Sequence, residues 1–251
     1  MILAVHSSPH PGGNLERMVL RVAESSGLEY ELMRLAELNI SFCKGCVRCA
    51  RSKRCVQKDD MALLYKRLES AQGLIIGGLN YNGRFNSLAH TFLERLFPLY
   101  HLEPSLKDTP AALVAVGGEN PERASRDIAG YLKEISMGKI VGVALFKSDT
   151  PPCFSCGLGP ECPVGMPALN WATADFKAFT TVKKEMFQRF EHNSDAVDAC
   201  YRLGQMLNTA VNGNWSRPTS GGGYYLLINR EPFHPPFPFH LAEAPFCTHL
   251  E

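Results

Sequence analysis

Short apolar runs alternate along residues 1–147 with segments whose apolar side chains recur every three or four positions. Apolar runs bounded by turn residues are typical of buried strands, whereas the longer spacing is typical of a helix packed on a core. Strands are predicted at residues 2–5, 28–35, 73–78, 111–116 and 139–146, and helices at residues 15–23, 61–70, 86–96 and 121–136. This alternation predicts an α/β fold with a doubly wound parallel sheet.

The strand predicted at residues 73–78, GLIIGG, contains no polar residue. An uninterrupted apolar strand is typical of a parallel sheet that helices cover on both faces. At the helix starts, Asn14 is a predicted N-cap of the first helix and Asp59 or Asp60 of the second, because short polar side chains accept hydrogen bonds from the first free N–H groups. The pattern therefore indicates a layered fold.

After residue 150 the regular alternation ends. Helices are predicted at residues 175–190 and 195–211. The tail at residues 232–240 is rich in proline and phenylalanine, and so forms neither a helix nor a central strand. We expect two regions, in which residues 1–150 form the α/β domain and residues 151–251 form a mostly helical extension with an extended tail, packed on the core or on a neighbouring subunit.

Three loops rich in glycine, serine and asparagine follow predicted strands, at residues 7–14, 79–85 and 117–120. In a doubly wound fold, ligands bind beyond the carboxyl ends of the parallel strands. The loop at residues 7–14, here called the first loop, also precedes a helix, so its free N–H groups lie at the positive end of the helix dipole and suit a phosphate. It matches neither the dinucleotide-binding nor the ATP-binding glycine motif. Ordinary turn chemistry at a helix start is the alternative.

Four cysteines occur within thirteen residues, as Cys43, Cys46, Cys49 and Cys55 in the spacing C-x2-C-x2-C-x5-C. Thiolates select zinc, copper(I) or iron–sulfur clusters. Structural zinc sites usually draw two ligand pairs from separate knuckles, whereas three cysteines at successive x2 spacings are typical of bacterial iron–sulfur sites. We predict that residues 43–58, here called the cysteine loop, bind one [4Fe–4S] cluster. A zinc or reduced-thiol loop is the alternative.

Charge is balanced over the chain but not in the cysteine loop. The basic residues that surround the thiols are Lys44, Arg48, Arg51, Lys53 and Arg54. Their charge is expected to lower the pKa of the cysteines and to offset an anionic cluster.

With 26 basic and 25 acidic residues the whole chain has a net charge of +1, which gives no electrostatic case for nucleic acid or an anionic membrane. No apolar run approaches the roughly 20 residues of a membrane span, and the apolar start is too short for a signal-peptide core.

A second group of cysteines, Cys153, Cys156 and Cys162, has the spacing C-x2-C-x5-C. A second metal or cluster there would need a fourth ligand, for which Cys200, Cys247 or a histidine are candidates. A redox disulfide and a lining near the first cluster are the alternatives. Cys200 lies among apolar residues at helical spacing, which favours a buried small side chain. Seven of the nine cysteines fall in these two groups, which is typical of a reducing compartment, and we expect a cytoplasmic protein.

Three segments together carry a family resemblance. They are Ser8-Pro9 with Gly13-Asn14, the four-cysteine motif followed by Asp59-Asp60-Met61, and Tyr81 and Gly83 ahead of a helix that contains Glu94-Arg95. On these motifs, residues 1–147 resemble the iron–sulfur flavoproteins of the NADPH-dependent FMN reductase group. The resemblance implies a flavodoxin-like, five-stranded parallel sheet in the order 2-1-3-4-5, with FMN at the carboxyl ends of the strands and a [4Fe–4S] cluster on the four cysteines.

The same resemblance assigns a part of the flavin to each loop. The first loop holds the FMN phosphate, and the other two flank the isoalloxazine ring. The implied contacts are Ser8, His10, Gly13 and Asn14 for the phosphate, Asn80, Tyr81, Asn82 and Gly83 for the ring, and Gly117 and Gly118 for the third wall.

Two of these loops depart from the family's pattern. Where the family usually has Gly-Ser-Pro-Arg, this chain has Ser-Ser-Pro-His at residues 7–10. A neutral imidazole holds a phosphate less firmly than a guanidinium, so a lower FMN affinity is expected. The family's Ser-Pro ahead of the tyrosine is Gly78-Leu79 here, and its lysine in the following helix is His90. These changes leave any contact with a nicotinamide open.

The leading functional hypothesis is a redox flavoprotein that passes electrons between a [4Fe–4S] cluster and FMN, and exchanges them with a ferredoxin-like partner or a small molecule. No catalytic side chain is expected, because electron transfer itself needs no acid or base. The resemblance implies a homo-oligomer, a dimer or a tetramer, in which cluster and flavin of adjacent subunits meet. Two alternatives stay open: an NAD(P)H-dependent FMN or quinone reductase without a functional cluster, and a non-enzymatic zinc-thiolate or redox-sensing module.

Overall fold

The computed structural model describes residues 1–101, 104–118, 120–135, 139–148, 150, 153–156, 158, 162 and 187–213. The strands are β1 (Ile2–His6), β2 (Tyr30–Arg34), β3 (Gly73–Tyr81), β4 (Arg84–Phe85), β5 (Pro110–Gly117) and β6 (Lys139–Lys147). The α-helices are α1 (Asn14–Ser26), α2 (Cys49–Ser52), α3 (Met61–Ser70), α4 (Ser87–Glu94), α5 (Pro121–Glu134), α6 (Cys153–Cys156) and α9 (Ser194–Val211). Short 3-10 helices are η1 (Leu35–Glu37), η2 (Phe97–Leu99) and η5 (Phe190–His192).

The parallel strands form one sheet in the order β2-β1-β3-β5-β6, and β4 pairs antiparallel with the end of β3. This is the predicted flavodoxin-like order 2-1-3-4-5, so the predicted fold class is confirmed. The apolar run at residues 73–78 lies within β3 in the middle of the sheet and is buried throughout. Helices on both faces explain why it contains no polar residue.

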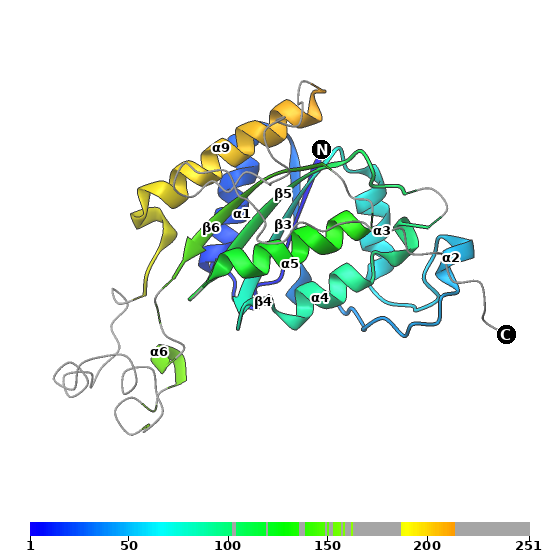
Figure 1. Ribbon diagram of the computed structural model, residues 1–251, viewed down its shortest axis with the longest axis horizontal. Coiled ribbons are helices and arrows are strands. Elements are labelled where there is room, and N and C mark those ends of the chain that lie inside the picture. Colours follow the sequence, from blue (N-terminus) through cyan, green and yellow to red (C-terminus); the bar gives the residue numbers. More distant parts are fainter. Residues whose placement is uncertain are drawn as a thin grey trace, which may run out of the picture.

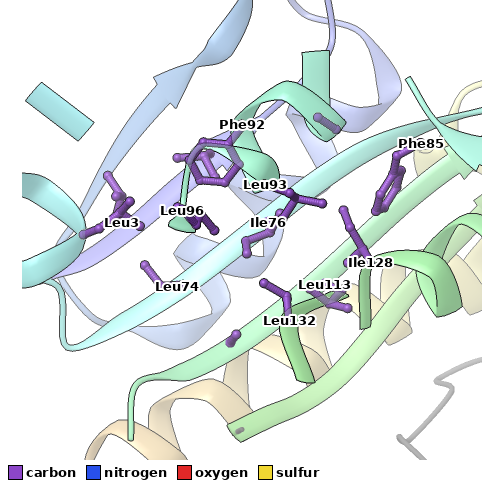
Figure 2. Close-up of a cluster of buried hydrophobic side chains, with 14 of the residues drawn as sticks. Leu3, Leu74, Ile76, Phe85, Phe92, Leu93, Leu96, Leu113, Ile128 and Leu132 are labelled. Carbon is purple, nitrogen blue, oxygen red and sulfur yellow. The ribbon is translucent and has the colours of Figure 1, made fainter. Parts of the chain in front are cut away.

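Helices cover the two faces of the sheet in separate groups (Figure 1). α3, α4 and α5 pack on one face, and α1 and α9 pack on the other. On the first face, Ile76 and Leu113 of the sheet belong to one buried cluster with Phe92 of α4 and with Ile128 and Leu132 of α5 (Figure 2). Burial of one such side chain contributes roughly 1.5–3 kcal/mol, so this core holds α4 and α5 firmly against the sheet.

α9 packs against α1, and the two backbones approach closely at Gly204. A Cβ at Gly204 would lie 2.5 Å from the carbonyl oxygen of Val22. Beside this contact, the amide of Asn208 donates to the carbonyl of Ser26 at 2.7 Å, at the end of α1. Residues 194–211, which the sequence places in the extension, therefore complete the helical layer on the second face of the sheet.

The segment after the central strand is more regular than the predicted turn-rich loop at residues 79–85. β3 continues to Tyr81 and forms a hairpin with β4. Asn82 and Gly83 connect the two strands, with φ of 54° and 82°. These left-handed values are those of a type I′ turn, for which Asn-Gly is a favoured sequence.

Some helix boundaries differ from their predictions. The N-cap of α1 is Gly13 rather than Asn14, and no side chain caps it. α3 begins at Met61 as predicted. Of the two predicted caps, the carboxylate of Asp59 accepts from the N–H of Met61 at 3.2 Å, whereas the Asp60 side chain does not cap the helix. Of the helix predicted at residues 175–190, the first twelve residues lie outside the described part, and residues 187–189 are not helical.

Much of the predicted extension lies outside the described residues. This applies to most of residues 151–186 and to residues 214–251, including Cys247 and the proline-rich tail. Within the part of the chain that is described, no helix is both long and apolar enough to cross a membrane.

Candidate functional site

The loops that follow β1, β3 and β5 meet at one edge of the sheet, as predicted. The N–H of Ser7 donates to the carbonyl of Gly77 at 3.0 Å, and the side-chain amide of Asn86 donates to the carbonyl of Ser7 at 2.8 Å. Gly117 lies so close to the side chain of Asn80 that a Cβ at this glycine would clash with it. The structure thus brings together the first loop, the β3–β4 hairpin and the end of β5.

A compact turn in the first loop holds a buried Ser8 beside an exposed His10. The Ser8 hydroxyl accepts from the N–H of His10 at 3.2 Å. Gly13 passes so near this turn that a Cβ would lie 3.3 Å from the carbonyl oxygen of His10. The buried hydroxyl of Ser7 has no hydrogen-bond partner within the described residues. A phosphate oxygen is an acceptor that this hydroxyl could serve, so the loop fits the phosphate of FMN.

A buried charged network supports the first loop. His6 is fully buried; its Nδ1 accepts from the N–H of Ser8 at 3.2 Å, and its Nε2 lies 3.5 Å from a carboxylate oxygen of Glu16. Because Nδ1 accepts, the proton of the neutral ring is on Nε2. Burial lowers the pKa of His6, and the nearby Glu16 charge partly opposes this effect. The N–H of Gly12 donates to the same carboxylate at 3.2 Å, so Glu16 already occupies one backbone donor of the loop.

Residues 187–191 cross the start of α1. The Asn14 amide donates to the carbonyl of Gln188 at 2.8 Å, and its oxygen accepts from the N–H of Phe190 at 3.1 Å. Beside it, Arg17 pairs with Glu191 at 2.5 Å. The resemblance implies that Asn14 contacts the phosphate, whereas here both polar groups of its side chain are hydrogen-bonded to the chain.

The β3–β4 hairpin presents an aromatic ring to the outside. Tyr81 is 53% exposed, and Asn82 is also exposed. Gly83 faces α5, where a Cβ would lie 3.3 Å from Nε of Arg123. Gly118, beyond the end of β5, is exposed as well. An exposed ring near glycine-lined backbone is suited to stack on a flat aromatic ligand, so the predicted ring-side residues fit an isoalloxazine.

The cysteine loop is mostly exposed. Cys43 and Cys46 are exposed, Cys55 is partly buried, and Cys49 is buried at the start of α2. The backbone turns through left-handed conformations at Gly45, Val47 and Lys53, with φ of 61°, 55° and 53°. A non-glycine residue adopts this conformation at a cost of roughly 1–2 kcal/mol. Such strained positions are typical of functional loops, and Val47 lies between two of the predicted metal ligands.

The thiols of this loop are close enough to influence one another's ionisation. The backbone N–H of Arg48, and to a smaller extent its side chain, donate hydrogen bonds to the Cys46 thiolate, and these bonds lower the pKa of Cys46. Burial raises the pKa of Cys49, and the charges of the other three cysteines add to this shift. Among the described residues, no three His, Cys, Asp or Glu side chains are gathered closely enough to hold a metal ion. Thiolates are soft ligands that iron–sulfur clusters select, so the four cysteines of this loop suit such a cluster by their chemistry.

A buried ion pair joins the cysteine loop to the end of α4. Asp59 accepts from both terminal nitrogens of Arg95, at 2.6 and 2.9 Å, and the two side chains are 4% and 1% exposed. Burial alone would raise the pKa of Asp59, but hydrogen bonds from Arg95 and Ser41 lower it. The same guanidinium donates to the carbonyl of Ser41 at 2.6 Å and to Sγ of Cys55 at 3.5 Å.

A cavity of about 380 Å³ lies against the cysteine loop. Its lining residues are Ser41, Lys44, Cys46, Arg48, Val56, Gln57, Lys58 and Asp59. The cations among them give this surface a positive potential, which favours anionic groups.

α4 lies between the two candidate sites. Asn86, its N-cap, contacts the first loop, and Arg95, just beyond its end, contacts the cysteine loop. At 1.5 Å per residue, the nine steps from Asn86 to Arg95 span roughly 13 Å. No role is predicted from the sequence for Arg95, which belongs to one of the family motifs, or for His6, which does not. Each residue has a signal in the sequence that could have predicted its role. Arg95 is a charged residue in an apolar helical segment, and His6 is a histidine at the end of an apolar strand.

The second cysteine group is described only in part. α6 carries Cys156, which is exposed, and Cys162 is partly buried. α6 and α2 lie at opposite ends of the view in Figure 1, which does not support a lining near the first cluster within one chain. Cys200 is fully buried in α9, and burial raises its pKa to about 12, as expected for a small core side chain.

Comparisons with known proteins agree with the sequence motifs. Residues 1–147 match the sequence model of the NADPH-dependent FMN reductase family. A curated protein of Archaeoglobus fulgidus named iron–sulfur flavoprotein is 30% identical over 138 residues, which is 53% of this chain and 60% of that protein. One of the same name from Methanosarcina thermophila is 28% identical over 120 residues, covering 47% of this chain and 63% of that protein. The chain thus spans less than two thirds of the length of these relatives.

Among solved structures, RosB with bound 8-demethyl-8-formylriboflavin-5′-phosphate superposes with a TM-score of 0.55 and covers 99% of each chain. The two sequences are 12% identical, so this similarity concerns the fold alone.

Proposed function

This chain belongs to the NADPH-dependent FMN reductase family, and we propose that it is an oxidoreductase that passes electrons between FMN and a [4Fe–4S] cluster. FMN would bind to the first loop, the β3–β4 hairpin and the residues after β5. The cluster would bind to Cys43, Cys46, Cys49 and Cys55.

The observation that carries this proposal is the four-cysteine loop and its anchoring to a flavin-reductase fold. The loop concentrates four thiols and is tied to α4 through the buried pair of Asp59 and Arg95. An ordinary surface loop needs no such anchor, because an exposed loop can satisfy its polar groups with water. The curated relatives with the name iron–sulfur flavoprotein give independent support.

The residues of the chain would bind and orient the two groups. When bound, FMN supplies one- and two-electron chemistry and an iron–sulfur cluster supplies one-electron chemistry. Ser7, Ser8 and the backbone of the first loop would hold the phosphate, and Tyr81 would stack on the ring. Arg48 stabilises the thiolate of Cys46, which favours metal binding, since the thiolate is the ligand form. No side chain needs to move a proton for electron transfer itself.

The positions of the two sites suggest the partners. The basic surface around the cysteine loop would attract an acidic electron-transfer protein such as a ferredoxin-like donor. The exposed hairpin would give a small acceptor access to the flavin. A second copy of the chain would bring a cluster and a flavin of different subunits together, so we propose a homo-oligomer. The grouped cysteines favour a reducing compartment, so we also propose a cytoplasmic location.

The first experiment is an absorption spectrum of protein purified without oxygen, together with FMN, iron, sulfide and zinc counted per chain. Flavin bands with about four iron and four sulfide are expected. About eight iron would extend cluster binding to Cys153, Cys156 and Cys162. Zinc without flavin would overturn the proposal and leave a zinc-thiolate or redox-sensing module.

A second candidate function is hydride transfer from NADPH to FMN, with a quinone or free flavin as acceptor. The description of the family as NADPH-dependent favours it. Flavin without iron, together with FMN reduction by NADPH in the absence of any other donor, would support this function over electron transfer through a cluster.

A further inference from the structure

The side chain of Arg95 is almost completely buried, which is unusual for an arginine. Its side chain is 1% exposed, and its Nε has no hydrogen-bond partner within the described residues. A buried guanidinium is costly unless its charge is paired and its donors are used. Asp59 pairs the charge with a two-bond fork, so the orientation of the guanidinium plane is determined by that carboxylate.

The ion pair holds both ends of the cysteine loop at once. Arg95 donates to the carbonyl of Ser41, which precedes the loop, and Asp59 follows it. The N–H of Ser41 donates to Asp59 at 3.1 Å, and this closes the connection between the two ends. Because Arg95 follows directly on α4, which is packed in the core, the base of the loop has a fixed position relative to the sheet.

The second donor of Nη2 is directed at a predicted cluster ligand. Nη2 of Arg95 lies 3.5 Å from Sγ of Cys55. A lysine in this place would have a point charge on a flexible chain and could not serve the carboxylate, the carbonyl and the sulfur in one plane. Cys43, Cys46 and Cys49 have no contact with Arg95 among the hydrogen bonds of the described residues.

We propose that Arg95 is a positioning residue for the cluster, which orients the Cys55 thiolate and raises the cluster's reduction potential through its N–H and its positive charge. This inference rests on the proposed function. Reduction of such a cluster would add one electron from the proposed ferredoxin-like donor, with no bond formed or broken, and would make the cluster more negative by one charge. A hydrogen-bond donor and a cation at a ligand sulfur stabilise that extra charge, which raises the potential.

The test is a potentiometric titration of the holoprotein and of its Arg95→Met and Arg95→Lys variants, with the cluster followed by electron paramagnetic resonance and the flavin by absorption. Arg95→Met is expected to shift the ratio of oxidised to reduced cluster at least tenfold toward oxidised at a fixed potential, which is 59 mV for one electron. Arg95→Lys, which keeps the charge, is expected to shift it less in the same direction. The flavin potential is expected to stay unchanged.

Arg67 provides a matched control, because it is a partly exposed arginine of α3 that pairs with Glu31. Arg67→Met should leave both potentials unchanged. A cluster potential that is the same in wild type, Arg95→Met and Arg95→Lys would overturn the inference and leave Arg95 with a purely structural role.

If the variants do not fold, a measurement on the wild-type protein tests whether Arg95 contacts the cluster. With arginine labelled with ¹⁵N, pulsed electron paramagnetic resonance of the reduced cluster should detect coupling to an arginine nitrogen, and its absence would overturn the inference. A protein with a cluster but no such coupling refutes only the role of Arg95. A wild-type protein that assembles no cluster at all refutes the proposed function, and the inference with it.

Discussion

The first loop and the cysteine loop lie at the two ends of α4, and they are built differently. The first loop is short and rests on the buried His6 and on residues 187–191, which are hydrogen-bonded to Asn14. The cysteine loop is longer and exposes two of its four cysteines, and its buried polar anchor is the Arg95–Asp59 pair at its base.

This difference predicts that the two proposed sites respond differently to substitutions. The first loop is held by a hydrogen bond to His6 and by the contacts of Asn14 with residues 187–191, which lie outside the cysteine loop. The cysteine loop is held at its base by the Arg95–Asp59 pair, and its four thiols would bind the proposed cluster. We therefore expect the flavin site to survive changes that destroy the cluster site.

The largest expected effect comes from Cys46→Ser. Loss of one thiolate should abolish the [4Fe–4S] cluster, because the proposed site has four cysteine ligands, while FMN binding is largely retained. Iron, sulfide and FMN counted per chain measure both outcomes. Undiminished cluster iron would show that the ligands are assigned wrongly, and equal loss of FMN would show that the two regions are not independent.

Asp59→Ala tests the base of the cysteine loop. It leaves the Arg95 guanidinium buried and unpaired, so the free energy of unfolding should fall by about 3 kcal/mol. Asp60→Ala is the matched control, because its carboxylate is exposed and accepts from the N–H of Asn39; it should cost less than about 1 kcal/mol. Urea unfolding of the cluster-free protein checks both values. Equal effects would mean that the ion pair does not anchor the loop.

Gly204→Ala tests the packing of α9 against α1, the helix that follows the first loop. The added methyl would press α9 away from the backbone of α1, with an expected loss of about 1–3 kcal/mol. Gly130→Ala is the control: this glycine of α5 is exposed and has open space around its Cβ, so the change should stabilise the protein by up to about 1 kcal/mol. Thermal unfolding measures the two changes, and a stabilised Gly204→Ala would contradict the close contact.

The smallest effect expected concerns pH and the first loop. Burial lowers the pKa of His6 below its ordinary 6.5, so the unfolded chain binds a proton that the folded chain does not. The contribution of His6 is therefore complete above pH 6.5 and is lost as the pH falls from there toward the lowered pKa, at up to about 1.4 kcal/mol per pH unit. In His6→Asn, whose amide oxygen can still accept from Ser8, this part of the pH dependence should disappear.

Unfolding free energies at a series of pH values between 5 and 8 test this prediction, with His192→Asn, at an exposed histidine, as the control. A pH dependence that is identical in wild type and His6→Asn would show that His6 does not contribute it.

Local patterns in the sequence predicted the layered fold well, and the cysteine motif can be read directly from the chain. The strand at residues 73–78 could be predicted because burial on both faces removes every polar residue from it. The turn at Asn82 and Gly83 also had a local signal, the Asn-Gly pair, although only the structure showed that it closes a hairpin. The spacing of the cysteines in the cysteine loop is likewise a property of neighbouring residues.

The sequence by itself therefore determined the order of the main strands and helices, the fold class and the spacing of the four cysteines, because each depends on residues close together in the chain. Only the tertiary structure decided that Asn14 binds Gln188, that α9 covers α1, and that Arg95 is paired with Asp59. These contacts join residues 36 to 182 positions apart. No spacing rule predicts such partners, because they meet only when the helices pack on the sheet.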